Sequence, residues 1–214
     1  MNRKVILFIA MSLDGFIAKS DGDISFLSLV EKEGEDYGYF AFMDTVDTVI
    51  LSRKTYDKVL SMVDELAYGE RDIYVLTRTP RPDSGRIKFF SRELTELTEN
   101  LKKQGGKNIF CDGGAETVSQ FLKNKLFDEL IISIIPVLLG DGIRLFGHNF
   151  PEQYLKLTGC KTYEKGLVQL HYIDQKLINP RLFLNLQAKQ TESANETTFP
   201  HPLHPFICRH FCPN

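Results

Sequence analysis

The stretch that decides the fold is Ile109-Phe110-Cys111-Asp112-Gly113-Gly114-Ala115-Glu116-Thr117-Val118. Its apolar first part predicts a buried strand, the glycine pair predicts a tight turn, and the pattern continuing through Phe121-Leu122 predicts a helix. The free N–H groups and the positive dipole end of such a helix form an anion site. Glycines also let a phosphate approach the backbone closely, so we expect this turn to bind one.

A glycine pair alone is a weak signal, because many strand–helix turns use one for structural reasons. The three-glycine Rossmann fingerprint is absent, so the ordinary dinucleotide-binding fold is not favoured. A second strand–helix junction strengthens the phosphate interpretation. Val49-Ile50-Leu51 runs into Ser52-Arg53-Lys54-Thr55-Tyr56, which places two cations and a hydroxyl in the first helical turn. A helix dipole alone prefers anionic side chains there, so these cations indicate a phosphate from outside the chain.

A third strand end has the same character. Tyr74-Val75-Leu76 ends at Thr77-Arg78, which puts another cation at the carboxyl end of a strand. Ligands of open α/β sheets bind at that edge. An exposed basic turn remains the alternative for any one of these pieces, and the agreement of three favours a shared site.

Alternation of strand and helix patterns through residue 125 predicts a mostly parallel sheet with helices on both faces. The last three strands have no helices between them, so they are expected to form an antiparallel edge. The predicted strands lie near 4–10, 48–52, 73–77, 87–90, 108–112, 128–137, 155–162 and 167–173. The predicted helices lie near 36–44, 54–62, 93–104 and 116–125.

The composition describes one globular domain. The chain has 214 residues, is 43% hydrophobic and 25% charged, and carries a formal net charge of −2. This charge offers no footprint for nucleic acid or for an anionic membrane, and no apolar run reaches the roughly 20 residues that span a bilayer. Met1-Asn2-Arg3-Lys4 and the apolar run after it imitate a signal peptide, but a buried first strand is the better interpretation. The four cysteines do not form a disulfide framework, which favours the cytoplasm.

The segment 174–214 changes character and is expected to be a disordered or vector-derived tail after a domain of residues 1–173. Its composition of proline, threonine, asparagine and histidine cannot bury much apolar surface. A zinc site in the tail is the alternative, but the spacing fits none of the common zinc patterns, so no metal is expected. The residues concerned are His201, His204, Cys208, His210 and Cys212.

Four motifs resemble the dihydrofolate reductase fold, and more closely its branch related to the C-terminal reductase domain of the riboflavin-pathway deaminase/reductase. The motifs occur in the order of that family and span residues 3–173. They are Ala10-Met11-Ser12-Leu13-Asp14-Gly15-Phe16-Ile17-Ala18, Arg53-Lys54-Thr55-Tyr56, Asp112-Gly113-Gly114 and Pro136-Val137-Leu138-Leu139-Gly140-Asp141-Gly142-Ile143-Arg144-Leu145-Phe146.

The resemblance implies a three-layer α/β fold and NADPH as the reductant. It implies a nicotinamide pocket lined by Ala10 and Ile17, a phosphate turn at Ser52, Arg53, Lys54 and Thr55, an adenosine-ribose wall at Leu76, Thr77 and Arg78, and a pyrophosphate turn at Gly113, Gly114, Ala115, Glu116 and Thr117. Cations suit the dianionic 2′-phosphate, which favours NADPH over NADH.

Three positions are distinctive. Ser52 stands where the family usually has glycine, and either crowds the cofactor or offers it a hydroxyl. The segment 23–27 lacks the tryptophan common there. Asp14 follows Leu13 in a turn, where an aspartate more often bonds its own backbone than acts as an acid.

A reductase also needs a proton donor, which calls for an acid in a largely apolar pocket. An ungapped count back from Arg53 puts Asp36 where dihydrofolate reductases have their pocket carboxylate, and Phe40 where they have an aromatic that stacks on the substrate. These two residues are four apart, so they are expected to share one helix face. The alternative for Asp36 is the solvated acidic cluster that it forms with Glu31, Glu33 and Glu35.

The first hypothesis is therefore a cytoplasmic NADPH-dependent reductase of a pterin or a ribosylaminopyrimidine-like substrate. A true dihydrofolate reductase is the alternative among enzymes, and an NADPH-binding module without turnover is the alternative from another class. The chain has no H-x-E motif with a partner C-x-x-C, so no deaminase activity is expected. The resemblance implies a homodimer, which the antiparallel edge strands would form.

Overall fold

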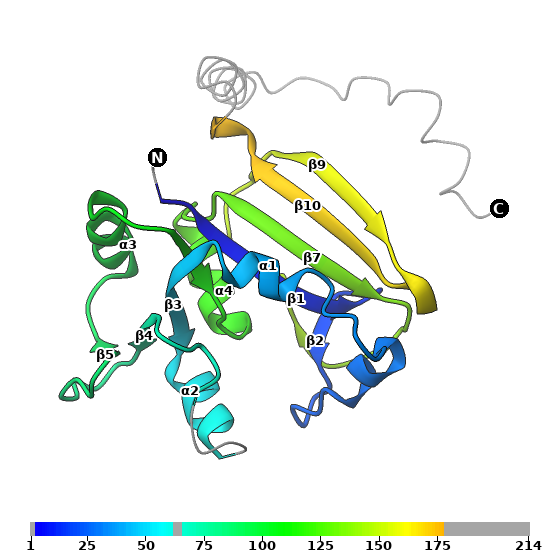
Figure 1. The fold of residues 1–214 in the computed structure, drawn as a ribbon, viewed down its shortest axis with the longest axis horizontal. Coiled ribbons are helices and arrows are strands. Elements are labelled where there is room, and N and C mark those ends of the chain that lie inside the picture. The colour runs from blue at the N-terminus through cyan, green and yellow to red at the C-terminus, as the bar shows by residue number, and fades with distance from the viewer. Residues whose placement is uncertain (1–2, 62–65, 178–214) are drawn as a thin grey trace, which may run out of the picture. The chain divides into compact units, whose positions relative to one another are not determined.

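A single large sheet organises the computed structural model, which describes residues 3–61 and 66–177 (Figure 1). Within the described residues the sheet has eight strands in the order β5-β4-β3-β6-β1-β7-β10-β9. These strands are β1 (Val5–Ser12), β3 (Val46–Ser52), β4 (Asp72–Leu76), β5 (Ile87–Phe90), β6 (Asn108–Cys111), β7 (Glu129–Ile135), β9 (Leu155–Thr162) and β10 (Val168–Asp174).

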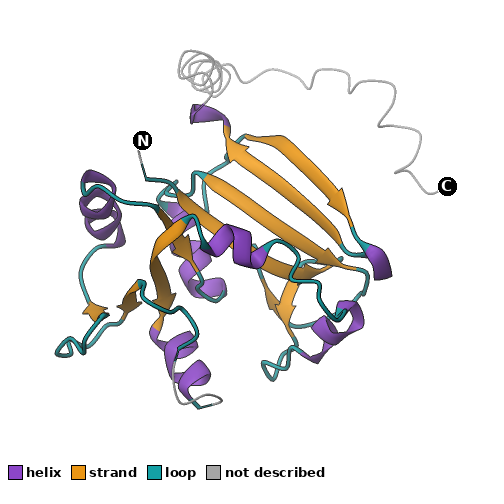
Figure 2. Ribbon diagram, in the orientation of Figure 1, coloured by secondary structure: helices purple, strands orange, loops and turns teal. Residues whose placement is uncertain are grey.

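Helices cover both faces of the sheet, as expected (Figure 2). They are α1 (Tyr39–Met43), α2 (Arg53–Leu60), α3 (Leu94–Lys103) and α4 (Ala115–Lys123), with short 3₁₀ turns at Ser25–Val30, Glu164–Gly166 and Gln175–Leu177. Side chains alternate between the faces along each strand. On β6, Ile109 and Cys111 pack with α3 and α4, while Phe110 packs with α1. The fold is therefore a three-layer α/β sandwich.

Strand β7 joins the parallel part of the sheet to its antiparallel edge. Strand β7 pairs parallel with β1 over seven residue pairs, from Ile6–Glu129 to Ser12–Ile135, and antiparallel with β10. The prediction that the last three strands form an antiparallel edge is confirmed, because β10 pairs antiparallel with both β7 and β9. Helix α4 makes the crossover between β6 and β7, so β7 enters the sheet in the direction of its neighbour β1.

Two short strands escaped prediction. β2 (Phe16–Ala18) pairs antiparallel with β8 (Ile143–Arg144) in a separate small sheet. They contain three and two residues, too few for a periodic pattern to show. Their pairing joins the first and last family motifs, which are more than a hundred residues apart in sequence.

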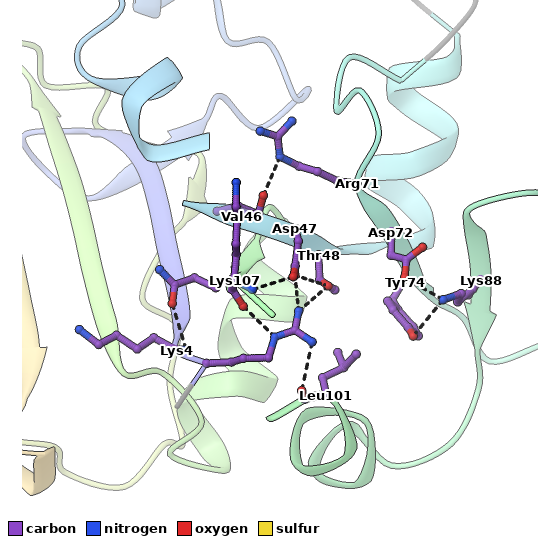
Figure 3. Close-up of polar contacts among 12 residues, drawn as sticks. Lys4, Val46, Asp47, Thr48, Arg71, Asp72, Tyr74, Lys88, Leu101 and Lys107 are labelled. Atoms are coloured by element: carbon purple, nitrogen blue, oxygen red, sulfur yellow. Dashed lines mark hydrogen bonds and ion pairs between the residues drawn. The ribbon is translucent and has the colours of Figure 1, made fainter. Parts of the chain in front are cut away.

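The amino ends of the strands are joined by a polar network around Arg3. Its guanidinium donates to Leu101 O at 3.1 Å, to Lys107 O at 2.7 Å and to Thr48 Oγ1 at 2.6 Å, and it pairs with Asp47 (Figure 3). The Arg3 side chain is 4% exposed. Groups of the folded domain accept the hydrogen bonds of this buried guanidinium. The segment that imitates a signal peptide is therefore part of the domain core. At the amino ends of the strands, these polar side chains therefore stabilise the fold.

The domain extends slightly beyond its expected limit. Strand β10 includes Asp174, whose amide donates to Asp128 O at 3.0 Å, and a 3₁₀ turn follows at Gln175–Leu177. The tail was predicted to begin at residue 174, so its first four residues were misassigned because the strand and its terminal turn continue through them. Residues 178–214, with the histidines and cysteines considered for zinc, lie outside the described residues. Across the described ranges, no helix is long and apolar enough to cross a bilayer.

Candidate active site

The strand order brings the three predicted phosphate turns to one edge of the sheet. Strands β4, β3 and β6 are direct neighbours, and all three run parallel. Ser52 at the end of β3 pairs with Leu76 at the end of β4. The amide of Asp112, just after β6, donates to Ile50 O on β3 at 2.9 Å. Segments separated by up to about sixty residues in sequence therefore end side by side.

A pocket of about 710 Å³ opens at this edge. Its walls come from the starts of α2 and α4, the loop after β4 and the turn after β5. The predicted cofactor residues among its lining are Ser52, Arg53, Lys54, Leu76, Thr77, Arg78, Glu116 and Thr117. The others, Ala10, Ile17, Thr55, Gly113, Gly114 and Ala115, do not line it. The pocket thus gathers the expected phosphate and adenosine-ribose residues from three separate turns.

The start of α2 explains the serine that replaces the usual glycine. Ser52 is the N-cap of the helix, and its side chain accepts the Thr55 amide at 3.0 Å. The Ser52 and Thr55 hydroxyl oxygens are 2.9 Å apart, and Thr55 Oγ1 also accepts the Gly114 amide at 3.4 Å. Ser52 therefore stabilises the helix start, as serine does at many N-caps.

Two acids of the pocket pair with the three cations predicted from sequence. Arg53 Nε donates to both carboxylate oxygens of Asp57 at 2.7 Å, one helical turn away. Glu116 lies between Lys54 at 3.6 Å and Arg78 at 3.2 Å. Lys54 and Arg78 are 89% and 94% exposed, so these two pairs are weak and separable. An incoming phosphate would replace Glu116 as their partner.

Sequence reasoning missed two further cations. Arg81 and Arg92 also line the pocket, on the loop after β4 and the turn after β5. Arg81 lies over the Phe89 ring at 5.7 Å from its centroid, and Arg92 lies over Phe90 at 5.4 Å. The signal was available for Arg92, because it follows a strand of the same sheet just as Arg78 does. The pocket is therefore rimmed by arginines from consecutive strand ends.

Gly113 and Gly114, the two glycines of the deciding turn, are accommodated there for different physical reasons. A Cβ on Gly113 would lie 2.4 Å from Thr117 Cβ, whereas a Cβ on Gly114 would meet Thr55 Oγ1 at 3.6 Å, an ordinary contact. Gly113 is thus required by packing within the turn, a reason other than the close approach of a phosphate. Gly114 is the N-cap of α4, so its neighbourhood keeps the open helix start that suits an anion.

On the α1 side of the same edge lies a carboxyl that the sequence analysis did not assign. Asp112 follows β6 on the face of Phe110, and Tyr68 donates a short hydrogen bond to its Oδ2. Burial raises the pKa of Asp112 to about 6, although the Tyr68 hydrogen bond opposes the rise. Burial raises the pKa of Tyr39 on α1, and the charge of Asp112 adds to that rise. A partly buried carboxyl with this acidity can donate a proton near neutral pH.

The comparisons with known proteins agree with this geometry. The family model for the RibD C-terminal domain matches residues 3–169. The chain belongs to this family. YwjB of Bacillus subtilis (strain 168), an uncharacterized protein, is 44% identical over 174 residues, which cover 81% of this chain and 99% of YwjB.

Two solved structures show the same fold as this RibD C-terminal domain. A protein of Shewanella sp. PV-4, provisionally assigned to riboflavin biosynthesis, superposes with a TM-score of 0.73 at 30% identity, covering 80% of this chain and 98% of that one. Dihydrofolate reductase from Enterococcus faecalis, solved with NADP(H) and RAB-propyl, superposes with a TM-score of 0.57 at 16% identity, covering 81% of this chain and 99% of that one. The resemblance to the dihydrofolate reductase fold and to its riboflavin-pathway branch is confirmed, and a reductase is the activity that this family supports.

Asp36 and Phe40 of this RibD C-terminal domain do not share a helix face. Helix α1 begins at Tyr39, so Asp36 lies in the turn before it, where it accepts the Gly38 amide at 2.9 Å and the Phe40 amide at 2.8 Å. These bonds to the Phe40 and Gly38 amides lower the pKa of Asp36, the direction opposite to that of a proton donor. Phe40 is 71% exposed. The expected helix face was wrong because Gly38, at φ 81°, breaks the helix before it reaches Asp36.

The predicted nicotinamide residues lie further along the same edge. Ala10 is on β1, in register with Ser133 of β7. Its side chain lies on the same face of the strand as those of Ile6 and Phe8. This is the α1 face, because Phe8 stacks on Phe42 with ring centroids 4.9 Å apart. Ile17 is on β2 and packs against the core on the other face. Ala10 and Asp112 thus belong to adjacent strands and open on the same side of the sheet.

Asp14 joins the first family motif to the last. Its carboxylate accepts the Ser12 hydroxyl at 2.6 Å, the Leu139 amide at 3.2 Å and the Gly140 amide at 2.7 Å. Chiefly through the Ser12 hydrogen bond, its pKa is lowered to about 2. A bond to the backbone of its own turn was expected, but the amides that Asp14 accepts are those of residues 139–140, and in its own turn it accepts the Ser12 hydroxyl. The two most specific motifs of the family therefore form one structural unit.

Proposed function

We propose that this chain is an NADPH-dependent reductase of a small cyclic or heteroaromatic substrate, a pterin or a ribosylaminopyrimidine-like molecule. The observation that carries the proposal is the arginine-rimmed pocket, which lies where three parallel strands end and two helices begin. Such an edge is where open α/β folds bind nucleotides. Family membership supports the reductase class.

The residues present fit the phosphates of NADPH. Arg53, Lys54, Arg78, Arg81 and Arg92 line the pocket against the two acids Asp57 and Glu116. A surplus of cations suits the dianionic 2′-phosphate, and arginine binds phosphate through paired N–H donors. The start of α4 at Gly114, with Ala115, Glu116 and Thr117, would hold the pyrophosphate. When bound there, the cofactor supplies the hydride.

We infer that the substrate lies on the α1 side of the same edge, close to Ala10. On that side of the sheet Phe8 stacks on the buried Phe42, and the Asp112 carboxyl follows β6 on the same face. In this proposal Asp112 gives the proton that accompanies reduction, because its pKa of about 6 keeps part of the population protonated near neutral pH. The earlier candidate Asp36 serves as the comparison, since the hydrogen bonds of its carboxylate cap α1.

Cofactor titration tests the proposal directly. NADPH and NADH are titrated by fluorescence against the wild type, Arg53→Ala, Arg78→Ala and the control Arg86→Ala, whose partner Glu70 is outside the pocket. Each pocket variant should lose about tenfold or more in NADPH affinity, the value of one charged hydrogen bond, and change little for NADH. Equal affinities for the two cofactors, or an unchanged NADPH affinity in both pocket variants, would contradict the 2′-phosphate assignment.

Substrate choice needs a separate screen. Oxidation of NADPH is followed with dihydrofolate, other pterins and ribosylaminopyrimidines, for the wild type, Asp112→Asn and Asp36→Asn. Turnover of dihydrofolate with tight antifolate inhibition would identify a true dihydrofolate reductase. NADPH binding without oxidation of any of these substrates would identify a binding module. We expect turnover that Asp112→Asn lowers by about 100-fold, the size of a lost general acid, and that Asp36→Asn lowers much less.

We also propose that two copies pair through the β9 edge of the sheet. β9 lies at the end of the strand order, and its Leu155 and Leu157 are 38% and 48% exposed. An unpaired strand edge with apolar side chains is normally covered in a folded protein. Light scattering should give the mass of a dimer, and Leu157→Lys should give that of a monomer; a wild-type monomer would refute the pairing.

A further inference from the structure

Asp112 is held by a tyrosine that sequence analysis left without a role. The Tyr68 hydroxyl donates to Asp112 Oδ2, and among the described residues Oδ1 accepts no hydrogen bond. Tyr68 is 6% exposed and packs in the core formed with α1 and α2. The hydroxyl therefore reaches the carboxyl from inside the protein, and Oδ2 is engaged while Oδ1 is left available.

Tyr68 is itself fixed by Arg71. The guanidinium of Arg71 donates to Tyr68 O at 2.9 Å and to Met43 O at 2.5 Å. It also donates to Val46 O at 3.1 Å (Figure 3). Met43 is the last residue of α1 and Val46 is the first of β3. The same arginine thus ties the Tyr68 segment to the end of α1 and to the sheet, which limits the movement of the Tyr68 backbone.

The other titratable groups around Asp112 stay in one charge state near neutral pH. Burial raises the pKa of Tyr39, of Tyr68 and of the Cys111 thiol, the last to about 12. All three remain neutral near neutral pH. The positive charge of Arg71 lowers the pKa of Tyr39, but burial outweighs this effect. Asp112 is therefore the group of this cluster whose protonation changes in the physiological range.

We propose that Tyr68 is a positioning residue for proton transfer, which holds Oδ2 of Asp112 and so presents Oδ1 to a substrate on the α1 face. The proposal rests on the proposed reductase function. In that reaction a C=N or C=O bond of the substrate gains a hydride at carbon from the reduced nicotinamide, which is oxidised. The heteroatom gains the proton from Asp112 Oδ1, and water later returns a proton to the carboxylate.

The Tyr68 hydrogen bond strengthens as this proton leaves. A hydroxyl binds a carboxylate more strongly than a neutral carboxyl, because the acceptor is then charged. Tyr68 consequently stabilises the state that follows proton donation more than the state that precedes it. This difference is what makes it a positioning residue for the reaction, in addition to a packing residue of the core.

Tyr68→Phe tests the proposal, because it keeps the ring in the core and removes only the hydroxyl. The pKa of Asp112 is measured by NMR from its carboxyl carbon, without cofactor, and Asp112→Asn identifies the signal. Loss of a hydrogen bond to a charged group should raise this pKa by roughly one unit. The pH midpoint of kcat should rise by the same amount. Tyr74→Phe is the matched control, since its hydroxyl contacts Lys88 at 3.4 Å and should leave both values unchanged.

The two readouts separate the possible failures. An Asp112 pKa that is equal in the wild type and in Tyr68→Phe overturns the proposal, and so does a raised pKa that the kcat profile does not follow. A chain that oxidises no NADPH contradicts the proposed function, while the NMR comparison still decides the coupling of the two side chains. If Tyr68→Phe does not fold, the wild type decides: the Tyr68 ring signals must titrate together with Asp112, and signals independent of that titration refute the coupling.

Discussion

The Gly114 amide donates to Thr55 Oγ1 at 3.4 Å, which joins the first turn of α4 to the first turn of α2. The two helices follow β6 and β3, which are neighbours in the sheet, so their amino ends lie side by side. The hydroxyl of Thr55 also lies 2.9 Å from that of Ser52. One side chain therefore links two helix starts, the feature on which the proposed phosphate binding depends.

Thr55→Val should weaken NADPH binding by about five- to tenfold, because it keeps the shape of threonine and removes the hydroxyl that links the two helix starts. Thr55→Ser keeps the hydroxyl and should bind NADPH nearly as well as the wild type. Isothermal titration measures both affinities. A Thr55→Val protein with wild-type affinity would show that the link has no part in binding.

Gly113→Ala should cost roughly 1–3 kcal/mol of unfolding free energy, the usual cost of overpacking, because its Cβ would lie 2.4 Å from Thr117 Cβ. Gly114→Ala is the matched control, since its Cβ meets Thr55 Oγ1 at an ordinary 3.6 Å. Urea unfolding of Gly113→Ala, Thr117→Gly and the double variant gives the coupling between the two positions. Additive effects in this cycle would disprove the steric explanation.

Asp112→Asn should stabilise the protein at pH 8 by roughly 1–2 kcal/mol and give no such gain at pH 4. The folded pKa is about 6 and the ordinary value is 3.8, so the folded state binds more protons between them and stability falls as the pH rises through this window. An asparagine carries no charge, so it avoids the cost of a partly buried carboxylate at high pH. Urea unfolding at the two pH values measures the difference in unfolding free energy between Asp112→Asn and the wild type. A difference that is the same at both pH values would be inconsistent with a raised pKa.

Asp14→Asn should loosen the loop at residues 139–140, where Asp14 accepts two amides. Hydrogen exchange of the Leu139 and Gly140 amides should become faster, because a neutral amide accepts more weakly than a carboxylate. Asp141→Asn is the control, since Asp141 contacts Gly142 and Ser20 instead. Unchanged exchange in Asp14→Asn would argue against the link between the two family motifs.

The same aspartate predicts a pH dependence with a defined sign. Its folded pKa is about 2 against an ordinary value of 3.8, so its stabilising contribution is complete above the ordinary value and disappears as the pH falls through about 2. The difference in stability between the wild type and Asp14→Asn should therefore shrink steadily below pH 4. A difference that stays constant down to pH 2 would exclude the carboxylate as its cause.

Most secondary structure was predictable because hydrophobic alternation and glycine turns are local signals. The strand at Asn108–Cys111 and the helix at Ala115–Lys123 lie within two residues of their expected ranges. The helix at Tyr39–Met43 was the exception, since the expected start near 36 ignored the turn that Gly38 makes. The paired strands at Phe16–Ala18 and Ile143–Arg144 had no local signal, because each is stabilised by the other.

The candidate site divides in the same way. Sequence predicted Arg53, Lys54 and Arg78 because each directly follows a strand. The first two also lie in the first turn of a helix, where the helix dipole disfavours cations. Asp112 is part of the deciding motif, but its raised pKa arises from burial, and the hydrogen bond from Tyr68, which is 44 residues away in sequence, opposes the rise. Asp36 was chosen by counting, and counting carries no information on burial or hydrogen bonding.

The turn at Gly113-Gly114 shows where the boundary lies. The sequence by itself determined a strand, a turn and a helix start, because these elements depend on residues next to one another in the chain. The amino end of such a helix favours anion binding. Only the tertiary structure decided that Gly114 meets Thr55 and that Asp112 faces Tyr68. Those contacts join separate strand–helix units, and the order of strands in the sheet, which no local pattern contains, brings them together.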